Sequence, residues 1–548
     1  MEDDKLLQIK DLVVEGLSDE KWQTLVNGIS LTLKRGEVLG LIGESGAGKS
    51  TIGLAAMGYA RQGCRIASGS IKLDKTELFN ATPEYLRSIR GTKISYVAQS
   101  AAASFNPAHR VIKQYTEGPI RHGLMDSSQA EEEAIAIYDR LFLPDPEKIG
   151  FRYPHELSGG QLQRAMVAMA KSCQPDIIVF DEPTTALDVT TQIEVLAAIK
   201  EITEKMNKAA LYITHDLAVV AQVAHRIMVL RHGSLVEEGN VREIIKNPQK
   251  QYTRDLLNVR NLRSEKSLAE KQDVILEIKD VEATYTGKEK VLQDINIRIK
   301  KGRTIALVGE SGSGKSTLAK VITGLLPATH GKITFLGEEL PLKLKHRNRD
   351  SLRKLQMIYQ MPDTALNPRH TVRTVIGRPL EFYFGMKGKE VEDRTKELLE
   401  KIELNPDKYI DRYTTQLSGG EKQRVCIARA LAAEPELIIC DEITSALDQL
   451  VAEGVLKLLQ NLQNELDVSY LFITHDLATV KAISDNIVIM LEGRVIEQGE
   501  KKEILSPPHH EYTDKLLGSI PEMDPDWLDN LLDERASIYL ENPPNSLG

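Results

Sequence analysis

GESGAGKS, residues 43–50, is the stretch on which the interpretation of this chain depends, and GESGSGKS repeats it at residues 309–316. Each copy follows an apolar run that predicts a strand, VLGLI at 38–42 and TIALV at 304–308. Glycines let backbone N–H groups curl around an anion, and the following helix directs the positive end of its dipole at the same point. Two copies in a strand–loop–helix setting favour phosphate-binding loops over plain glycine-rich turns. The sequence therefore predicts two nucleotide sites.

Two side chains in each loop have a defined chemistry in sites of this kind. The lysines, Lys49 and Lys315, reach the β- and γ-phosphates, and the hydroxyls of Ser50 and Ser316 hold Mg²⁺. We therefore expect ATP and Mg²⁺ as cofactors. The predicted nucleotide contacts of the two loops are Gly43, Ser45, Gly46, Gly48, Lys49, Ser50, Thr51, Gly309, Ser311, Gly312, Gly314, Lys315, Ser316 and Thr317.

Length and composition limit the possible classes of protein. A chain of 548 residues exceeds what one hydrophobic core supports, so we expect more than one domain. The net charge of −9 disfavours a nucleic-acid partner. The four cysteines lack C-x-x-C spacing, and no apolar run approaches the ~20 residues that span a bilayer. We expect a cytosolic protein with no direct membrane insertion, whose part in any membrane process is peripheral.

Four further runs recur in the same order after each phosphate loop. They are KISYVAQ and KLQMIYQ, LSGGQLQR and LSGGEKQR, DIIVFDE and LIICDE, and ALYITH and LFITH. The chain is therefore an internal duplication. We predict a first domain at 1–258, a charged linker at 259–273, a second domain at 274–518 and an acidic tail at 519–548.

A strand that ends in Asp-Glu supplies the hydrolytic groups of each copy. The aspartate is placed to hold Mg²⁺, and the adjacent glutamate to deprotonate the attacking water. The alternative is that the two acids only end a strand at the protein surface. Four apolar residues before each pair indicate a buried strand and disfavour this alternative. A histidine ends the next buried strand and is interpreted as a γ-phosphate sensor. The predicted catalytic residues are Glu182, His215, Glu442 and His475.

The LSGG runs predict a second anion site in each copy, because a serine and two glycines stand at the start of a helix. One capping serine would satisfy a helix start, so the paired glycines suggest that a phosphate of another molecule approaches the backbone. The residues concerned are Ser158, Gly159, Gly160, Ser418, Gly419 and Gly420.

This set of motifs resembles the ABC (ATP-binding cassette) ATPases over nearly the whole chain. The resemblance adds a Q-loop at Gln99 and Gln360 and a D-loop at 186–188 and 446–448. It implies an α/β fold of two tandem cassettes, each a RecA-like phosphate-loop core with an antiparallel β-subdomain and an α-helical subdomain. The implied metal ligands are Ser50, Gln99, Asp181, Ser316, Gln360 and Asp441.

The same resemblance implies two head-to-tail ATP sites, each between one cassette's phosphate loop and the other's LSGG run. Lys49 would share a nucleotide with Ser418, and Lys315 with Ser158. An extended linker at ~3.4 Å per residue reaches about 50 Å, enough for both halves to meet within one chain.

Shorter runs resemble one subfamily. SFNP at 104–107 and ALNP at 365–368 follow the Q-loops, and NPQKQYTRDLL at 247–257 and PPHHEYTDKLL at 507–517 end the two halves. These runs resemble the ATPase subunits of oligopeptide, dipeptide and nickel importers. The resemblance implies an energy-coupling subunit on the cytoplasmic face of the cell membrane, with transmembrane permease subunits and, through them, a solute-binding protein as partners. The chain lacks the C-terminal cysteine cluster of several such subunits, so we expect no iron–sulfur centre.

Two rival functions have discriminating features. A soluble twin-cassette ATPase acting on ribosomes carries a long charged helical linker, whereas the linker here is short. A DNA-repair ATPase needs a long coiled coil, and no sustained heptads occur. The sequence leaves four points open. They are the transported solute, the direction of transport except by resemblance, the permease partners, and whether the two sites turn over equally.

Two last expectations concern single elements. The run WLDNLL in the tail predicts a short helix docked on the second cassette, and an element that binds a partner is the alternative. By resemblance, Tyr285 stacks on the adenine of the second site, whereas alignment places Gly16 at that position in the first copy. We therefore expect Trp22 to reach the adenine of the first site; a tryptophan that covers the β-subdomain is the alternative.

Overall fold

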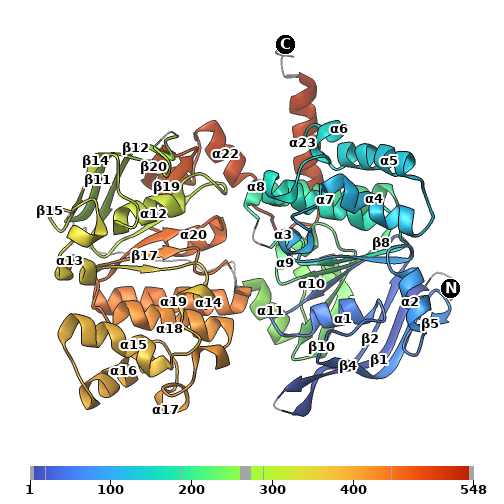
Figure 1. Ribbon diagram of the computed structural model, residues 1–548, viewed down its shortest axis with the longest axis horizontal. Coiled ribbons are helices and arrows are strands. Elements are labelled where there is room, and N and C mark those ends of the chain that lie inside the picture. The colour runs from blue at the N-terminus through green and yellow to red at the C-terminus, as the bar shows by residue number, and fades with distance from the viewer. Residues whose placement is uncertain are drawn as a thin grey trace. The chain divides into compact units, whose positions relative to one another are not determined.

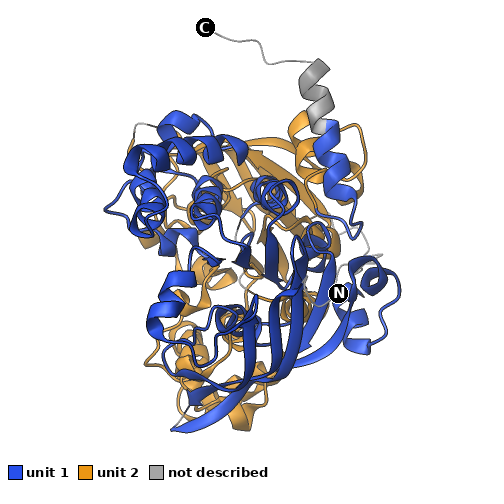
Figure 2. Cartoon of the chain, turned by 90° about the vertical axis from the view of Figure 1, so that its right-hand side faces the viewer, with its two compact units in different colours: residues 1–258, 521–548 blue, residues 259–520 orange. Residues whose placement is uncertain are grey.

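The computed structural model describes residues 5–18, 20–185, 187–258, 273–287, 289–445 and 447–541. The predicted linker therefore lies outside the described residues except for Asp273. The chain forms two compact units (Figures 1 and 2). Unit 1 comprises residues 1–258 and 521–548, and unit 2 comprises residues 259–520.

Unit 1 contains two sheets. The antiparallel sheet has the order β2-β1-β4-β5, with β1 (Lys5–Ser18), β2 (Lys21–Lys34), β4 (Cys64–Leu73) and β5 (Thr76–Glu77). The six-stranded sheet has the order β10-β9-β3-β8-β7-β6 and is parallel except for the β9–β10 pair. Its strands are β3 (Val38–Ile42), β6 (Ile94–Val97), β7 (Ile177–Asp181), β8 (Ala209–Thr214), β9 (Arg226–Arg231) and β10 (Ser234–Asn240).

The strands β3, β7 and β8 are buried along their whole length, as expected for parallel strands covered on both faces. They lie side by side in the sheet, so their carboxyl ends meet at one edge. The phosphate loop, the Asp-Glu pair and His215 follow these three strands directly. The topology thereby gathers three separate motifs at one place.

The helices of unit 1 include a helical group, α3 to α7, inserted between β6 and β7 (Figure 1). Their bounds are α1 (Lys49–Ala55), α2 (Pro83–Ile89), α3 (Ala101–Ser104), α4 (Val111–Arg121), α5 (Ser127–Arg140), α6 (Pro146–Ile149), α7 (Gly159–Lys171), α8 (Val189–Lys200), α9 (Leu217–Ala221), α10 (Val241–Lys246), α11 (Gln251–Asn258) and α23 (Trp527–Glu541).

Unit 2 repeats this arrangement. Its antiparallel sheet has the order β12-β11-β14-β15, and its six-stranded sheet the order β16-β17-β18-β13-β19-β20. The strands are β11 (Val274–Ala283), β12 (Leu292–Lys300), β13 (Thr304–Val308), β14 (His330–Phe335), β15 (Glu338–Glu339), β16 (Leu355–Ile358), β17 (Leu437–Asp441), β18 (Ser469–Ile473), β19 (Asn486–Leu491) and β20 (Arg494–Glu500).

The helices of unit 2 also include an inserted group, α14 to α18, between β16 and β17. Their bounds are α12 (Lys315–Thr323), α13 (Arg349–Lys354), α14 (Pro362–Ala365), α15 (Val372–Pro379), α16 (Lys389–Lys401), α17 (Pro406–Tyr409), α18 (Gly419–Leu431), α19 (Gln449–Leu466), α20 (Leu477–Ile483), α21 (Lys501–Ile504) and α22 (Glu511–Leu517). Each unit therefore has the three parts that the family resemblance implied, and the predicted fold class is confirmed.

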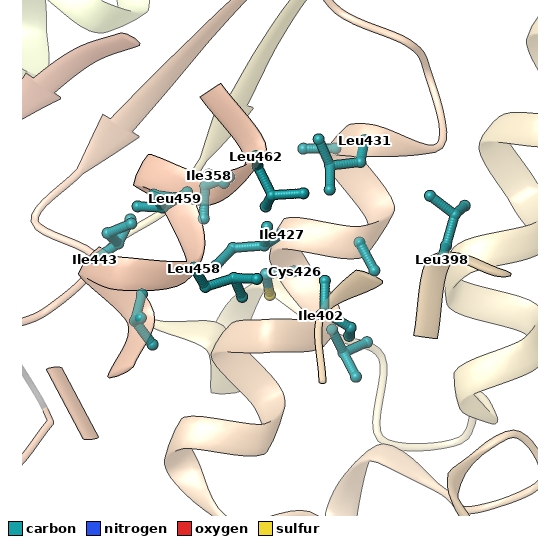
Figure 3. Packing of buried hydrophobic residues seen from close by; sticks show 14 of the residues in the cluster. Ile358, Leu398, Ile402, Cys426, Ile427, Leu431, Ile443, Leu458, Leu459 and Leu462 are labelled. Atoms are coloured by element: carbon teal, nitrogen blue, oxygen red, sulfur yellow. The ribbon is translucent and has the colours of Figure 1, made fainter. Parts of the chain in front are cut away.

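The helical group of unit 2 packs on the parallel sheet through one apolar cluster. Figure 3 shows Ile427 of α18 between Ile358 of β16 and Leu458 of α19, and Leu398 of α16 at the outer side. All four side chains are buried. Burial of such a side chain stabilises the fold by roughly 1.5–3 kcal/mol. This cluster fixes the α18 start, and with it the LSGG run, relative to the sheet.

The acidic tail docks on unit 1, so its predicted placement on the second cassette was wrong. Leu528 of α23 is fully buried, and its backbone N–H donates to Oε1 of Gln222 at 3.1 Å. Gln222 Nε2 donates in turn to the carbonyls of Glu522 at 2.7 Å and Asp524 at 3.1 Å. Two ion pairs complete the contact, Lys200 with Asp529 and Arg242 with Asp526.

The two halves differ at the positions that receive the tail. Gln222, Lys200 and Arg242 of the first half correspond in the repeat to Ala482, Gln460 and Lys502. Alanine cannot accept and donate the three backbone hydrogen bonds that Gln222 makes. Gln222 and Lys200, which the second half replaces with Ala482 and Gln460, therefore help to place the tail on unit 1.

Candidate nucleotide sites

Both phosphate loops lie between a buried strand and the start of a helix. In the first, Gly43, Gly46 and Gly48 have φ angles of 153°, 81° and 91°. A Cβ on Gly43 would lie 2.1 Å from the carbonyl oxygen of Leu230, so glycine is required there. The second loop repeats the pattern at Gly309, Gly312 and Gly314. Backbone in this conformation turns successive N–H groups toward one point, which suits a phosphate.

The loop lysines are buried and point back over the loop. Lys49 Nζ donates to the carbonyls of Gly43 at 2.7 Å and Glu44 at 2.9 Å. Lys315 Nζ donates to the equivalent carbonyls, and both lysines are 5% exposed. Each loop therefore holds a positive charge against backbone carbonyls at the start of its helix.

The loop serines contact the strand-end aspartates, although the two motifs are far apart in sequence. Ser50 Oγ donates to Asp181 at 2.7 Å, and Ser316 Oγ to Asp441 at 3.0 Å. The aspartates are buried, and burial raises the pKa of Asp441, which the hydrogen bond from Ser316 partly offsets. A hydroxyl and a carboxylate oxygen side by side are the oxygen ligands that Mg²⁺ prefers.

The glutamates after these aspartates contact the strand-end histidines. Glu182 Oε1 lies 3.3 Å from His215 Nδ1, and Glu442 Oε1 lies 3.4 Å from His475 Nδ1. The structure therefore brings together each glutamate and histidine that the sequence placed on separate strands.

The glutamates also occupy strained backbone. Glu182 has φ 49° and Glu442 has φ 48°, a left-handed conformation that costs non-glycine residues roughly 1–3 kcal/mol. Their backbone N–H groups donate to the carbonyls of Ile213 at 2.8 Å and Ile473 at 2.9 Å, which fixes the turn. Other matched pairs of the two halves, such as Asn207 and Asp467, also have positive φ, so the conformation belongs to the turn that the duplication repeats after each buried strand.

Charge keeps the glutamates ionised although they are partly buried. Burial alone would raise the pKa of Glu182, but the hydrogen bond and charge of His215 and the charge of Lys49 lower it below 4.5. Burial likewise tends to lower the pKa of His215, and Glu182 raises it above 6.5. The second site has the same balance between Glu442 and His475.

The Q-loop glutamines reach the same glutamates. Gln99 Nε2 donates to Glu182 Oε2 at 3.0 Å, and Gln360 Nε2 donates to Glu442 Oε2. Both glutamines are exposed. Their contact in this structure is therefore with the predicted catalytic glutamate, and their predicted role as metal ligands stays a prediction.

The LSGG serines cap helices. Ser158 Oγ accepts from the N–H of Gln161 at 3.3 Å, and Gln161 Oε1 accepts from the N–H of Ser158 at 3.1 Å, a reciprocal capping box. Ser418 forms the same box with Glu421. Helix capping alone therefore accounts for a serine at each of these helix starts, and no ligand is needed to explain it.

The two glycines after each serine have different surroundings. A Cβ on Gly160 would lie 1.9 Å from Thr191 Cγ2, and one on Gly420 would lie 2.5 Å from Val451 Cγ1. Packing within the cassette therefore explains the second glycine. A Cβ on Gly159 would lie 3.8 Å from Leu187, in ordinary contact. Packing within the cassette does not explain why the first position of the pair is a glycine. The predicted contact of this glycine with a phosphate stays a prediction.

The other predicted contacts belong to the two phosphate loops and the helices that follow them. Ser45, Gly46, Ser311 and Gly312 are exposed at the loop tips, whereas Thr51 and Thr317 follow the serines in the first helical turn. Of each D-loop, Ala186 and Ala446 lie outside the described residues.

The two predicted adenine aromatics differ in their contacts. The hydroxyl of Tyr285 lies 3.2 Å from Thr317 Oγ1, which places the tyrosine beside the second phosphate loop. The ring of Trp22 is covered on one face by the guanidinium of Arg65, whose carbon lies 4.1 Å from the ring centroid. Arg65 is held by Glu15 at 2.7 Å. The role of Trp22 at the first site stays a prediction.

Two tyrosines at the sites lack a predicted role. Tyr252 Oη accepts from the N–H of Glu44 at 3.3 Å, and Tyr512 Oη accepts from the N–H of Glu310 at 3.0 Å. Both tyrosines belong to the YT runs that end the two halves, so that repeat was the available signal. A third, Tyr96, donates to Asp181, whereas methionine stands at this position in the repeat.

Comparisons with known proteins agree with this geometry. The family model described as "ABC transporter" matches residues 26–185 and 292–445, and the model described as "Oligopeptide/dipeptide transporter, C-terminal region" matches residues 496–544. The chain is 35% identical to the glutathione import ATP-binding protein GsiA of Escherichia coli O6:H1, over 95% of this chain and 90% of that protein. It is 36% identical to GsiA of Salmonella choleraesuis, over 91% and 87%.

A solved structure shares the fold over most of the chain. The complex of the archaeal ribosome recycling factor aABCE1 with the ribosomal stalk protein aP1 matches with a TM-score of 0.62, covering 90% of each chain at 22% identity. A likeness at this identity concerns the fold alone.

Proposed function

The chain belongs to the ABC transporter family of ATP-binding proteins, and from this premise we propose that it couples ATP hydrolysis to the import of peptides or similar small solutes. The observation that carries the hydrolytic part is the contact of a strained, ionised glutamate with a histidine in each cassette. The import part is supported by the relatives, which are import ATP-binding proteins, and by the peptide-transporter region matched at residues 496–544.

The residues at each loop fit ATP with Mg²⁺. Ser50 with Asp181, and Ser316 with Asp441, present oxygens of the kind that this ion takes. The ion would offset the charge of the phosphates. The glycine-rich backbone would hold the phosphate oxygens, and Lys49 and Lys315 would add a positive charge beside them.

The glutamates supply the base for hydrolysis. Glu182 and Glu442 are held ionised by the adjacent histidines, so each is ready to accept a proton from an attacking water. A positioned base of this kind contributes roughly 10²–10⁴-fold to the rate. His215 and His475 orient the carboxylates, and the glutamine contacts link the same carboxylates to the segments that precede α3 and α14.

Partners in the membrane complete this function. No described helix combines the length and the apolar composition that a membrane crossing requires. We place the docking sites for permease helices beside Gln99 and Gln360, with a solute-binding protein acting through the permease at the far side. The protein would then work from the cytoplasmic face of the membrane.

Site-directed crosslinking tests the assignment. Ser104→Cys and Ala365→Cys place a thiol beside each Q-loop, and Thr76→Cys on β5 is the matched exposed control. Cys64 is replaced by serine, because it is partly exposed and could react with the crosslinker. Cys173, Cys426 and Cys440 are buried and need no change. The proposal is supported if Ser104→Cys and Ala365→Cys crosslink to integral membrane proteins and Thr76→Cys does not. Transfer to ribosomal proteins alone would overturn it.

A further inference from the structure

The two nucleotide sites differ at one position beside the aspartates that are expected to hold Mg²⁺. Tyr96 of β6 and Met357 of β16 are structural counterparts, because each strand pairs with its neighbour in the same register. Tyr96 pairs with Val179 and Met357 pairs with Ile439, each of which stands two residues before the strand-end aspartate. Both side chains are partly buried and pack on the apolar cluster of their own unit. The exchange of tyrosine for methionine therefore occurs at one place in the fold.

The carboxylate of Asp181 in the first site is held through both of its oxygens. Ser50 Oγ donates to Oδ1 at 2.7 Å, and the hydroxyl of Tyr96 donates to Oδ2. The guanidinium of Arg61 interacts with the tyrosine oxygen. Because arginine can only donate, the hydroxyl proton of Tyr96 is left for the carboxylate. With one donor at each oxygen, Asp181 has a fixed orientation.

The carboxylate of Asp441 in the second site has one such partner. In the part of the chain that the structure describes, its hydrogen bond comes from Ser316 Oγ alone, to Oδ1 at 3.0 Å. Met357 cannot supply a second one, because a thioether has no proton to donate. Lys320 adds a positive charge near Asp441 where the first half has Leu54, but no hydrogen bond joins the two side chains. The second oxygen of Asp441 therefore lacks the tyrosine donor of the first site.

This difference bears on the metal ion because the serine partner is itself a predicted metal ligand. Ser50 and Ser316 are expected to bind Mg²⁺ through the same hydroxyls that contact the aspartates here. The orientation of each carboxylate beside a bound ion then depends on a second partner, and loss of such a partner costs metal sites roughly 10–100-fold in affinity. A tyrosine is a neutral donor, so Tyr96 fixes the carboxylate without cancelling its charge.

We propose that Tyr96 is a positioning residue, which fixes Asp181 for Mg²⁺ in the first site, and that the second site binds the ion more weakly for lack of such a residue. This inference rests on the ATP-hydrolysing part of the proposed function. As the concentration of divalent cation falls, the second site loses its ion first and the first site stays filled. The two sites are therefore unequal in their cation requirement, although their glutamates and histidines match.

Cation affinity measured at one site at a time tests the inference. Lys315→Ala removes the loop lysine of the second site and Lys49→Ala that of the first, so each background reports on the other site. The whole chain is held in excess over the non-hydrolysable nucleotide AMP-PNP, and binding of Mn²⁺ is followed by electron paramagnetic resonance. The first site should bind Mn²⁺ about tenfold more tightly than the second.

Substitutions at the exchanged position should move these affinities in opposite directions. Tyr96→Phe removes only the hydroxyl and should weaken Mn²⁺ binding about tenfold at the first site, with no change at the second. Met357→Tyr should tighten binding at the second site severalfold. Tyr85→Phe is the control, at another partly buried tyrosine that packs on the same cluster of unit 1, and should change neither affinity. Melting curves without nucleotide or cation show whether each variant is folded.

The inference would be overturned if Tyr96→Phe left Mn²⁺ affinity at the first site unchanged, or lowered it equally at both sites. Equal affinity of the two sites before substitution, or no gain from Met357→Tyr, would also overturn it. Met357→Tyr keeps the test decisive if Tyr96→Phe does not fold. Absence of nucleotide-dependent Mn²⁺ binding at both sites would instead contradict the proposed function itself.

Discussion

Glu182 and His215 show how single residues combine strain and charge at these sites. The glutamate is held in left-handed backbone and remains ionised although it is partly buried, because the histidine contacts it at 3.3 Å. The duplicate pair in the second cassette repeats both features. A glutamate in left-handed backbone beside a histidine therefore occurs once in each cassette. This repetition supports a role for the pair in chemistry that both cassettes share.

The stability of each pair depends on pH in a defined direction. The raised pKa of His215 stabilises the fold below its ordinary value of 6.5, and this contribution is lost as the pH rises through the raised value. The lowered pKa of Glu182 stabilises the fold above its ordinary value of 4.5, and this contribution is lost as the pH falls through the lowered value. The ion pair is therefore fully effective between pH 4.5 and 6.5.

His215→Gln should consequently lower the melting temperature most within that window. The wild-type advantage should shrink as the pH rises above 6.5. Melting curves across pH 4–9, without nucleotide or divalent cations, measure the difference, and His109→Gln on an exposed loop is the control. A difference that does not change with pH would show that the contact contributes packing without charge.

At the scale of elements, the start of α7 combines two requirements in adjacent glycines. Gly160 is needed so that α7 can approach α8, whereas Gly159 has room for a methyl group. Helix packing therefore explains the second glycine of this LSGG run, and the proposed ligand contact concerns only the first.

Alanine at each glycine separates the two requirements. Gly160→Ala should destabilise the protein by roughly 1–3 kcal/mol, because its Cβ would overlap Thr191. Gly159→Ala should leave the melting temperature near that of the wild type and lower the ATPase rate. Denaturant unfolding and ATP turnover, measured on both variants, decide the matter. Full activity of a stable Gly159→Ala protein would remove the phosphate role of this glycine.

The tail is an element whose docking depends on partners distant in sequence. Leu528→Ala should weaken the docking of α23 by about 2–5 kcal/mol, since the side chain is fully buried. Amide hydrogen exchange in residues 521–534 should become faster, and Asn530→Ala, at an exposed position of the same helix, should leave it unchanged. Unaltered exchange in Leu528→Ala would mean that the ion pairs of Lys200 and Arg242 suffice.

At the scale of the whole molecule, the duplication determines what the sequence could predict. Each motif occurs twice, so the sequence indicated the phosphate loops, the Asp-Glu pairs and the histidines, and the family resemblance implied the fold. The Glu–His contacts depend on the order of the parallel strands in the sheet, which the structure supplies. The tail was misplaced because Gln222 and Lys200 give no local signal of a partner some three hundred residues away. Tyr252 and Tyr512 were visible as a repeat, but their contacts with the loop backbone needed coordinates.

ATP-driven uptake into vesicles tests the proposed function most directly. The chain and the membrane subunits that co-purify with it are reconstituted in vesicles with the chain and ATP enclosed in the lumen, and accumulation of glutathione, dipeptides and tripeptides in the lumen is quantified by mass spectrometry. The wild type should accumulate at least one of these solutes. Glu182→Gln with Glu442→Gln should lower uptake and ATP turnover about a hundredfold or more while ATP still binds, since each loses a catalytic base. Glu84→Gln with Glu338→Gln, at exposed positions, should match the wild type. The assignment would be contradicted if uptake were unaffected by loss of the two glutamates. It would also be contradicted if ATP turnover responded to ribosomes and not to the membrane subunits.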